Sequence, residues 1–333
     1  MRIGSITGGF RLPMVLAAAF LGLAGTALMT AGCSQTPSVI PVSSADRLAI
    51  GEHMADLGDV KLWYKVAGHG PRIIVSSVSW GAGSAYLQHP NGIAPLEQHF
   101  TLIYVNARGT PPSTRPSDET QMSTSVVADD LEKLRVYLNL PQVDLLGHSA
   151  GAMIVLGYAE RYPEHARKLV LLDGAPLDTF PSPRLKEIID SWRGDPRYAA
   201  AIARHDHSEF PPTDAGFSQY LADILPLYFR DPERYAPQFA QTMTKPMDYW
   251  ASVHNDAADK LAPMPQSQLL GQVTAQTLVI VGRADFICPV EDSERIAQGI
   301  PGAKLVIFER SGHMVWIEER ERFFNVVSDF LRG

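Results

Sequence analysis

The chain has 333 residues, 45% of them hydrophobic, and a formal net charge of −7. This length and apolar content are enough for one large hydrophobic core or two modest ones. The negative charge argues against nucleic acid and against an anionic membrane surface as partners. The two cysteines, Cys33 and Cys288, stand in very different contexts, which argues against a structural disulfide.

Residues 1–33 are predicted to be a targeting segment. Arg2 and Arg11 supply positive charge, and residues 12–29 are apolar and rich in Ala, Leu and Gly. This is the layout of a secretory signal, followed by a linker over residues 34–47 that begins polar and proline-rich. The protein is therefore expected to be exported.

The end of this segment, Ala31-Gly32-Cys33, resembles a bacterial lipoprotein cleavage box, in which the cysteine is lipidated and becomes the new N-terminus. Thr30 stands where that box usually has Leu. Cys33 is thus a candidate lipidation site, which predicts a membrane-anchored lipoprotein. Simple cleavage with release, to the periplasm or outside the cell, and retention as an uncleaved anchor are the alternatives.

The predicted fold starts with strands. Residues 48–54 and 60–66 suggest an antiparallel hairpin around Gly58-Asp59. Residues 72–78 are predicted to form a buried strand, followed by a loop of small residues, 79–83.

A further strand and a helix follow. Residues 100–105 are predicted to be a strand, and residues 106–116 a loop dense in turn residues. Ser123 or Thr124 can cap the next helix. One face of that helix is apolar and carries Val127, Leu131, Leu134 and Leu138.

Residues 143–162 contain a nucleophile elbow, the strand-turn-helix unit that presents a catalytic residue. An apolar strand leads into Gly147-His148-Ser149-Ala150-Gly151, and an apolar helix follows. A G-x-S-x-G pattern in this context fits an elbow better than a plain glycine-rich turn. Both glycines are required because side chains two positions either side of the serine would collide. The strained turn lifts the Ser149 hydroxyl clear of the sheet, at a helix N-terminus where negative charge is favoured.

The chain changes character at about residue 178. After the strand 169–172, strand-like runs disappear until residue 271, and Pro, Asp and aromatic residues separate short helical stretches. The sheet pattern then resumes with strands at 277–281 and 304–308 and a closing amphipathic helix at 320–331. Strands that alternate with helices imply a mostly parallel sheet. We therefore predict a core of residues 48–177 and 272–333 with a helical cap, residues 178–271, inserted into it.

A serine nucleophile needs a base and an acid, and in this fold they follow it in the order Ser, acid, His. His313 is the one histidine after the insertion, directly past a strand. Asp285 also follows a strand, at the edge where catalytic groups gather. Asp173 competes for the role of acid, although Asp173-Gly174 can instead shape the turn into the insertion.

Acyl transfer also needs two donors for the oxyanion. One is predicted to be the backbone N–H of Ala150, the residue after the nucleophile. The other is expected from the loop after the strand 72–78, at Ser79 or Trp80, between whose amides the sequence does not choose. Trp80 can equally be an aromatic that packs against the cap.

Cap aromatics are candidates for substrate binding, since buried sites are mostly apolar. The alternative is that they only hold the cap helices together. The candidates are Trp192, Tyr220, Tyr228, Phe229 and Trp250. No metal or other cofactor is expected, because His205-Asp206-His207 points successive side chains in different directions and no further ligand is near. Cys288 is read as a small packing residue.

The stretch from about residue 48 to residue 331 resembles the α/β-hydrolase superfamily. Residues 81–87, 104–109 and 147–151 are similar to its proline iminopeptidase-like branch, peptidase family S33. The resemblance implies an eight-stranded sheet with a helical cap after the sixth strand.

Two motifs depart from that branch. It usually has His-Gly-Gly-Pro-Gly where residues 77–81 read Ser-Val-Ser-Trp-Gly, and Asp-x-Arg-Gly where residues 106–109 read Asn-Ala-Arg-Gly. An iminopeptidase also needs cap carboxylates for the substrate's ammonium, and Glu187, Asp190 and Glu209 are available without being marked out. Three readings follow: a serine hydrolase of a small ester, lactone or amide, an aminopeptidase acting on short peptides, and a non-catalytic binding protein on a hydrolase fold.

Overall fold

The computed structural model describes residues 44–333, which fall in one compact unit. The predicted targeting segment, Cys33 and most of the linker lie outside the described residues. Within residues 44–333, no helix has the length and apolar character needed to cross a bilayer.

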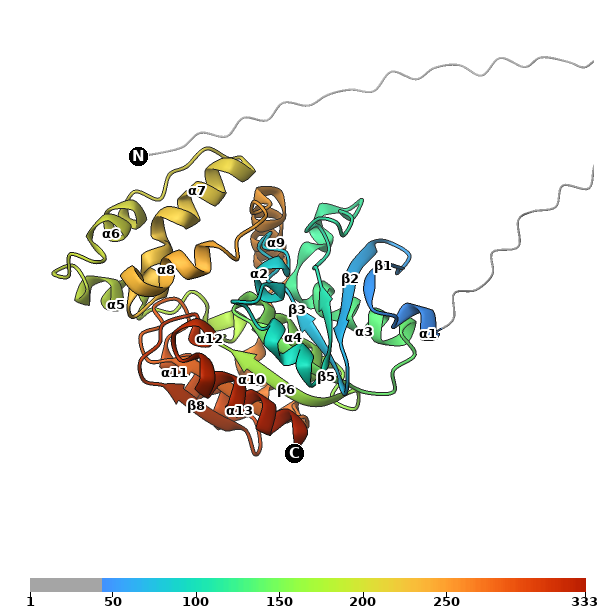
Figure 1. Ribbon diagram of the computed structural model, residues 1–333. Helices are drawn as coiled ribbons and strands as arrows, with labels where there is room; N and C mark the ends of the chain where they lie inside the picture. The colour runs from blue at the N-terminus through green and yellow to red at the C-terminus, as the bar shows by residue number, and fades with distance from the viewer. Residues whose placement is uncertain (1–43) are drawn as a thin grey trace, which may run out of the picture. The chain divides into compact units, whose positions relative to one another are not determined.

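An eight-stranded sheet organises the fold, with strand order β1-β2-β4-β3-β5-β6-β7-β8 (Figure 1). β1 and β2 pair antiparallel, as do β2 and β4, and the other neighbours are parallel. The strands are β1 (Gly51–Asp56), β2 (Lys61–Gly68), β3 (Arg72–Ser76), β4 (Thr101–Val105), β5 (Val143–His148), β6 (Ala166–Leu172), β7 (Gln276–Gly282) and β8 (Lys304–Phe308). The predicted α/β fold with a mostly parallel sheet is confirmed.

Helices cover both faces of this sheet because its strands are apolar on both sides. In β3, Ile74 belongs to one buried cluster, whereas Ile73 and Val75 belong to the other. The first cluster includes residues of α3 (Thr124–Tyr137), α4 (Ala150–Arg161) and α11 (Val290–Gly299). The second includes residues of α2 (Ala85–Gln88), η1 (Ala94–Gln98), α12 (Val315–Glu318) and α13 (Arg320–Arg332).

Local signals explain most element boundaries. Ser123 rather than Thr124 caps α3, since its hydroxyl accepts the Val126 N–H. β6 begins at Ala166, earlier than the apolar run suggests. Its Lys168 is buried because the ammonium donates to the carbonyls of Phe330 and Leu331 at the end of α13. A buried lysine whose ammonium is hydrogen-bonded can thus lie inside a strand, although the apolar run in the sequence begins only after it.

The insertion between β6 and β7 is helical, as predicted. Its elements are η3 (Leu177–Thr179), α5 (Leu185–Ser191), α6 (Ala199–Asp206), α7 (Asp214–Ile224), η4 (Leu225–Tyr228), α8 (Pro232–Ala240), α9 (Tyr249–Leu261), α10 (Gln266–Leu269) and η5 (Leu270–Gln272). Figure 1 shows α5 to α8 gathered in one group. α9 contacts α7 of this group and, more extensively, η2 (Glu119–Met122), which precedes α3 in the core.

Candidate active site

The turn between β5 and α4 is a strained elbow. Ser149 has φ 56° and ψ −125°, a conformation that is costly for a residue with a side chain. A Cβ added to Gly147 would lie 2.2 Å from the Gly151 carbonyl oxygen, and one added to Gly151 would lie 2.7 Å from the Ser76 carbonyl oxygen. Both glycines are therefore required by backbone contacts, for the steric reason that the sequence pattern suggests.

Asp285 and His313 lie together although they come from different loops. Asp285 follows β7 and His313 follows β8. The Nδ1 of His313 and the Oδ2 of Asp285 are 2.7 Å apart, and both side chains are almost fully buried. The other carboxylate oxygen of Asp285 accepts the backbone N–H groups of Ile287 and Cys288, each at 3.0 Å. These bonds fix the carboxylate and, through it, the imidazole.

Ser149 and His313 line the same cavity. Among residues 44–333, no hydrogen bond joins the Ser149 hydroxyl to His313. In many enzymes that bond shortens only once substrate is in place.

Asp173, the competing acid, has a different set of partners. It directly follows β6 and has φ 49°, and its Oδ1 accepts the backbone N–H of Gly282 at 2.9 Å. Burial, and then the negative charge of Asp285, raise the pKa of Asp173 well above its usual value. Asp173 thus ties the end of β6 to the loop that carries Asp285, and it is Asp285 that bonds His313.

His148, the variable position of the elbow, supports the backbone of His313. Its Nε2 donates to the His313 carbonyl at 3.2 Å, so its Nδ1 accepts the Tyr86 hydroxyl at 2.9 Å. Burial, and then the nearby His313, lower the pKa of His148 well below its usual value. A neutral imidazole with one donor and one acceptor fits both bonds.

The loop after β3 lies beside the elbow. Trp80 lines the cavity and packs edge-on against Phe180, with ring centroids 5.5 Å apart. The Ser79 side chain points elsewhere: its hydroxyl donates to Oδ1 of Asn255 in α9 at 2.9 Å. Ala150, the first residue of α4, also lines the cavity.

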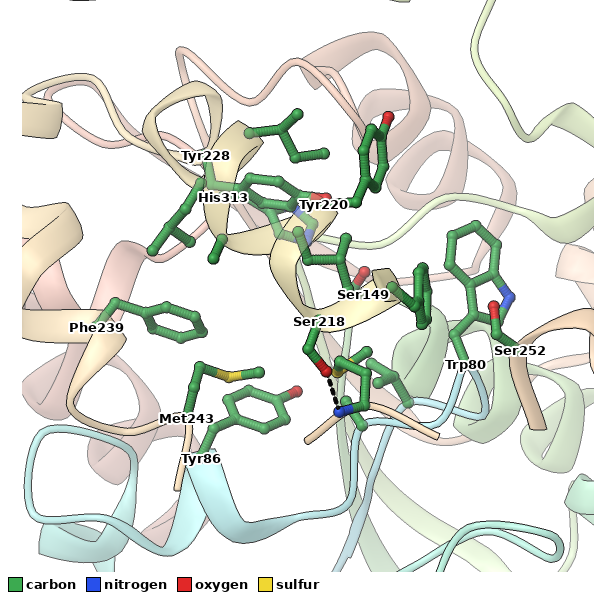
Figure 2. Close-up of a pocket in the computed structure, with 18 of the residues that line it drawn as sticks. Trp80, Tyr86, Ser149, Ser218, Tyr220, Tyr228, Phe239, Met243, Ser252 and His313 are labelled. Atoms are coloured by element: carbon green, nitrogen blue, oxygen red, sulfur yellow. Dashed lines mark hydrogen bonds between the residues drawn. The ribbon is translucent and has the colours of Figure 1, made fainter. Parts of the chain in front are cut away.

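The cavity has a volume of about 700 Å³ and is mostly apolar. Figure 2 shows Tyr86, Phe239 and Met243 on one side of it and Trp80 with Ser252 on the other. No lining residue, among those the structure describes, is an aspartate or a glutamate.

Of the five cap aromatics proposed as substrate contacts, two line the cavity and three do not, which corrects the placement of those three. Tyr220 and Tyr228 line the cavity, whereas Trp192, Phe229 and Trp250 do not. Trp192 stacks on Tyr198, Phe229 is fully buried against Phe239, and Trp250 stacks on His254. Trp192 and Phe229 thus pack cap segments against one another, which was the alternative interpretation. Trp250 and His254 belong to the same helix, α9, and Trp250 packs toward Met122 of the core.

Other lining residues carried no readable signal in the sequence. They include Tyr86, Phe180, Phe217, Phe239 and Met243. Only the fold brings together residues so far apart in the chain.

The remaining candidates have structural partners. Cys288 is fully buried against a cluster that includes Ala150 and Met153. His205 lines the cavity, while its neighbour Asp206 pairs with Arg193. In residues 44–333, no group of three or more His, Cys, Asp or Glu side chains is arranged to hold a metal ion.

The sequence is similar to a known family and to several characterised hydrolases. Residues 81–320 match the family described as alpha/beta hydrolase fold. A 2-hydroxymuconate semialdehyde hydrolase of Pseudomonas putida is 30% identical over 258 residues, which cover 75% of this chain and 84% of that protein. The proline iminopeptidase PfmaB of Pestalotiopsis fici is 26% identical over 270 residues, covering 80% and 94%.

A solved structure has the same fold as this chain. The proline iminopeptidase of Mycobacterium smegmatis superposes with a TM-score of 0.64 at 21% identity, over 85% of this chain and 98% of that one. At this identity the likeness is one of fold.

Proposed function

The chain belongs to the α/β-hydrolase family of enzymes, and on that premise we propose that it is a serine hydrolase with Ser149 as nucleophile, His313 as base and Asp285 as acid. The observation that carries this proposal is the 2.7 Å bond between His313 and Asp285 beside a strained elbow serine. A histidine that donates from Nδ1 to a carboxylate keeps the lone pair of Nε2 for the serine proton.

The proposed reaction has two stages. Ser149 Oγ attacks the substrate carbonyl carbon while His313 Nε2 takes the hydroxyl proton. The carbonyl oxygen becomes an oxyanion, for which the N–H of Ala150 and that of Ser79 or Trp80 are the proposed donors. As the intermediate collapses, His313 protonates the leaving group. Water then hydrolyses the acyl-enzyme, with His313 as base once more.

The substrate that we propose is a small ester, lactone or amide with an apolar, uncharged group. A mostly apolar cavity of about 700 Å³ has room for such a group, and apolar lining with few polar anchors is usual for small-molecule sites. Tyr220 and Tyr228 are the predicted contacts from the insertion.

The aminopeptidase reading has support from the proline iminopeptidase relatives, but the cavity argues against it. A substrate ammonium needs a carboxylate, and the described lining has none. Glu187 pairs with Arg184, and Asp190 with Lys186 and Arg193, so two of the three carboxylates considered are paired.

A substrate panel tests the proposal. p-Nitrophenyl esters of increasing acyl length are assayed beside aminoacyl naphthylamides, with wild type and Ser149→Ala. We expect turnover of apolar esters only, and loss of roughly 10⁴–10⁶-fold in the variant. Faster turnover of the naphthylamides would favour the aminopeptidase. A Ser149→Ala variant with a tenth of the wild-type rate would overturn the assignment of the nucleophile.

We also propose export, with lipidation at Cys33 as the mode of membrane attachment. The basis is the sequence layout of residues 1–33. Expression of wild type and Cys33→Ser with labelled palmitate, followed by fractionation, tests it. Label and membrane association should both be lost in the variant. An unlabelled, membrane-bound wild type would instead indicate an uncleaved anchor.

A further inference from the structure

We propose that Asn255 is a positioning residue, which holds the loop after β3 in place through the hydroxyl of Ser79. The inference rests on the proposed function, because that loop matters for catalysis only if it supplies an oxyanion donor. Asn255 belongs to α9, in the insertion, and lies 176 positions from Ser79 in the sequence. No motif in the sequence connects the two.

The Asn255 side chain joins two segments of the core. Its Oδ1 accepts the Ser79 hydroxyl at 2.9 Å, and its Nδ2 donates to the Met122 carbonyl at 2.8 Å. Asn255 and Ser79 are each 1% exposed. Both bonds are therefore shielded from water, and breaking either would leave a buried polar group without its partner.

A second contact ties the same loop to the start of α9. The Asp248 N–H donates to the Gly81 carbonyl at 3.0 Å. Gly81 has φ +80°, and a Cβ there would lie 2.1 Å from the Asp248 carbonyl oxygen. Asp248 is itself fixed as the N-cap of α9, where its side chain accepts the Ala251 N–H at 2.8 Å.

These two contacts flank Trp80 on both sides. Ser79 is held through its side chain and Gly81 through its backbone, so the peptide groups between them have little freedom to turn. The same stretch lies beside the Ser149 cavity, since Trp80 and Ser252 of α9 both line it (Figure 2). An oxyanion donor is effective only when its direction is set before the charge develops. The contact with α9 sets that direction from outside the cavity.

The test compares steady-state kinetics of Asn255→Ala, Ser79→Ala and the double variant on the best ester of the panel. A donor that turns away should lower kcat by roughly 10–100-fold and leave KM within about twofold, because the bond acts mainly in the transition state. If the two residues act through one bond, the double variant should be no slower than the slower single variant.

Thr124→Val is the matched control. Thr124 is also buried, and its hydroxyl donates to Asp259 of α9 at 2.8 Å, so the variant removes a bond between α9 and the core that does not involve the loop. It should lower Tm as the Asn255 variant does, yet leave kcat within about twofold. An equal loss of kcat in Thr124→Val would show that general loosening of α9 is responsible and would overturn the proposal.

A further readout separates positioning from binding. Affinity for an alkyl boronic acid, which forms a tetrahedral adduct with an active serine, should fall in Asn255→Ala by about the same factor as kcat/KM. Unchanged kcat and boronate affinity would overturn the role of Asn255 and leave the proposed function intact. An inactive wild type, or an active Ser149→Ala, would instead defeat the proposed function itself.

Discussion

Ser149 combines a strained backbone with a side chain that lines a cavity. Its φ of 56° and ψ of −125° suit glycine far better than serine, and such conformations cost about 1–3 kcal/mol. The surrounding backbone maintains the strain, since Gly147 and Gly151 pack against carbonyl oxygens at distances that leave no room for a Cβ. The conformation that exposes the Ser149 hydroxyl therefore lowers the stability of the folded chain locally.

This strain predicts an order of stabilities. Ser149→Gly should be more stable than Ser149→Ala by about 1 kcal/mol in free energy of unfolding, and should therefore unfold at a higher temperature. Glycine relieves the strain at a smaller cost in backbone entropy. Both variants should be inactive, and thermal unfolding of the pair measures the difference. An alanine variant at least as stable as the glycine variant would contradict the idea that the elbow is strained.

Single substitutions can also decide whether Asp285 or Asp173 is the catalytic acid. Asp285→Asn should lower kcat by roughly 10⁴-fold, because an amide favours the wrong tautomer of His313. Asp173→Asn should cost far less, since Asp285 rather than Asp173 bonds His313 and an asparagine Oδ1 can still accept the Gly282 N–H. Ester hydrolysis by the two variants decides the matter. A larger loss in Asp173→Asn would make Asp173 the acid.

The sequence indicated these residues because chain order and strand ends are local features. Strand ends locate Asp173 and Asp285 equally well, however, and only the hydrogen bond to His313 distinguishes them. The sequence did not indicate Asn255, because the role proposed for it depends on a hydrogen bond to a residue 176 positions away.

Among the elements, strands were more predictable than the faces of cap helices. A buried parallel strand is apolar on both sides, so its sequence marks it without knowledge of its neighbours. A short cap helix has apolar residues toward the cavity and toward other helices, and its sequence does not say which is which. Tyr220 and Trp192 illustrate the two outcomes, since Tyr220 lines the cavity and Trp192 stacks on Tyr198.

That contrast gives a prediction for the insertion. Tyr220→Ala should shift the kcat/KM ratio between bulky and small acyl esters by roughly 1–3 kcal/mol, because it enlarges the cavity. Trp192→Ala is the control: it should lower Tm through lost packing and leave the ratio unchanged. Measured ratios that move equally in the two variants would show that helix packing, rather than cavity lining, sets substrate preference.

At the scale of the whole described unit, the two ends of the insertion meet over one buried carboxyl. Asp178, near the first end, accepts hydrogen bonds from the backbone N–H and hydroxyl of Ser267, near the second. Glu160 of α4 lies close to this junction, is 3% exposed, and has no hydrogen-bond partner for either carboxyl oxygen in the described chain. Burial, and then the charge of Asp178, raise the pKa of Glu160 to about 9.

A raised pKa in an acid makes folding depend on pH in a definite direction. Between the ordinary value of 4.5 and about 9, the folded chain holds a proton on Glu160 that the unfolded chain has released. The contribution of Glu160 to stability is therefore fully present below pH 4.5 and is lost progressively up to about pH 9. Other buried acids, such as Glu318 with its pKa raised to about 7, act in the same direction.

Comparison with Glu160→Gln isolates this one group, since every other acid is shared by the two proteins. The amide cannot ionise, so the variant should gain stability relative to wild type as the pH rises, by roughly 2 kcal/mol or more between pH 5 and pH 8. Urea unfolding of both proteins at several pH values measures the difference, and esterase activity at pH 7 confirms that the cavity is intact. A difference that stays constant with pH would mean that Glu160 ionises normally in the folded chain. If the variant instead lost stability relative to wild type as the pH rose, the ionised form of Glu160 would be stabilised in the folded wild type at the junction between core and insertion.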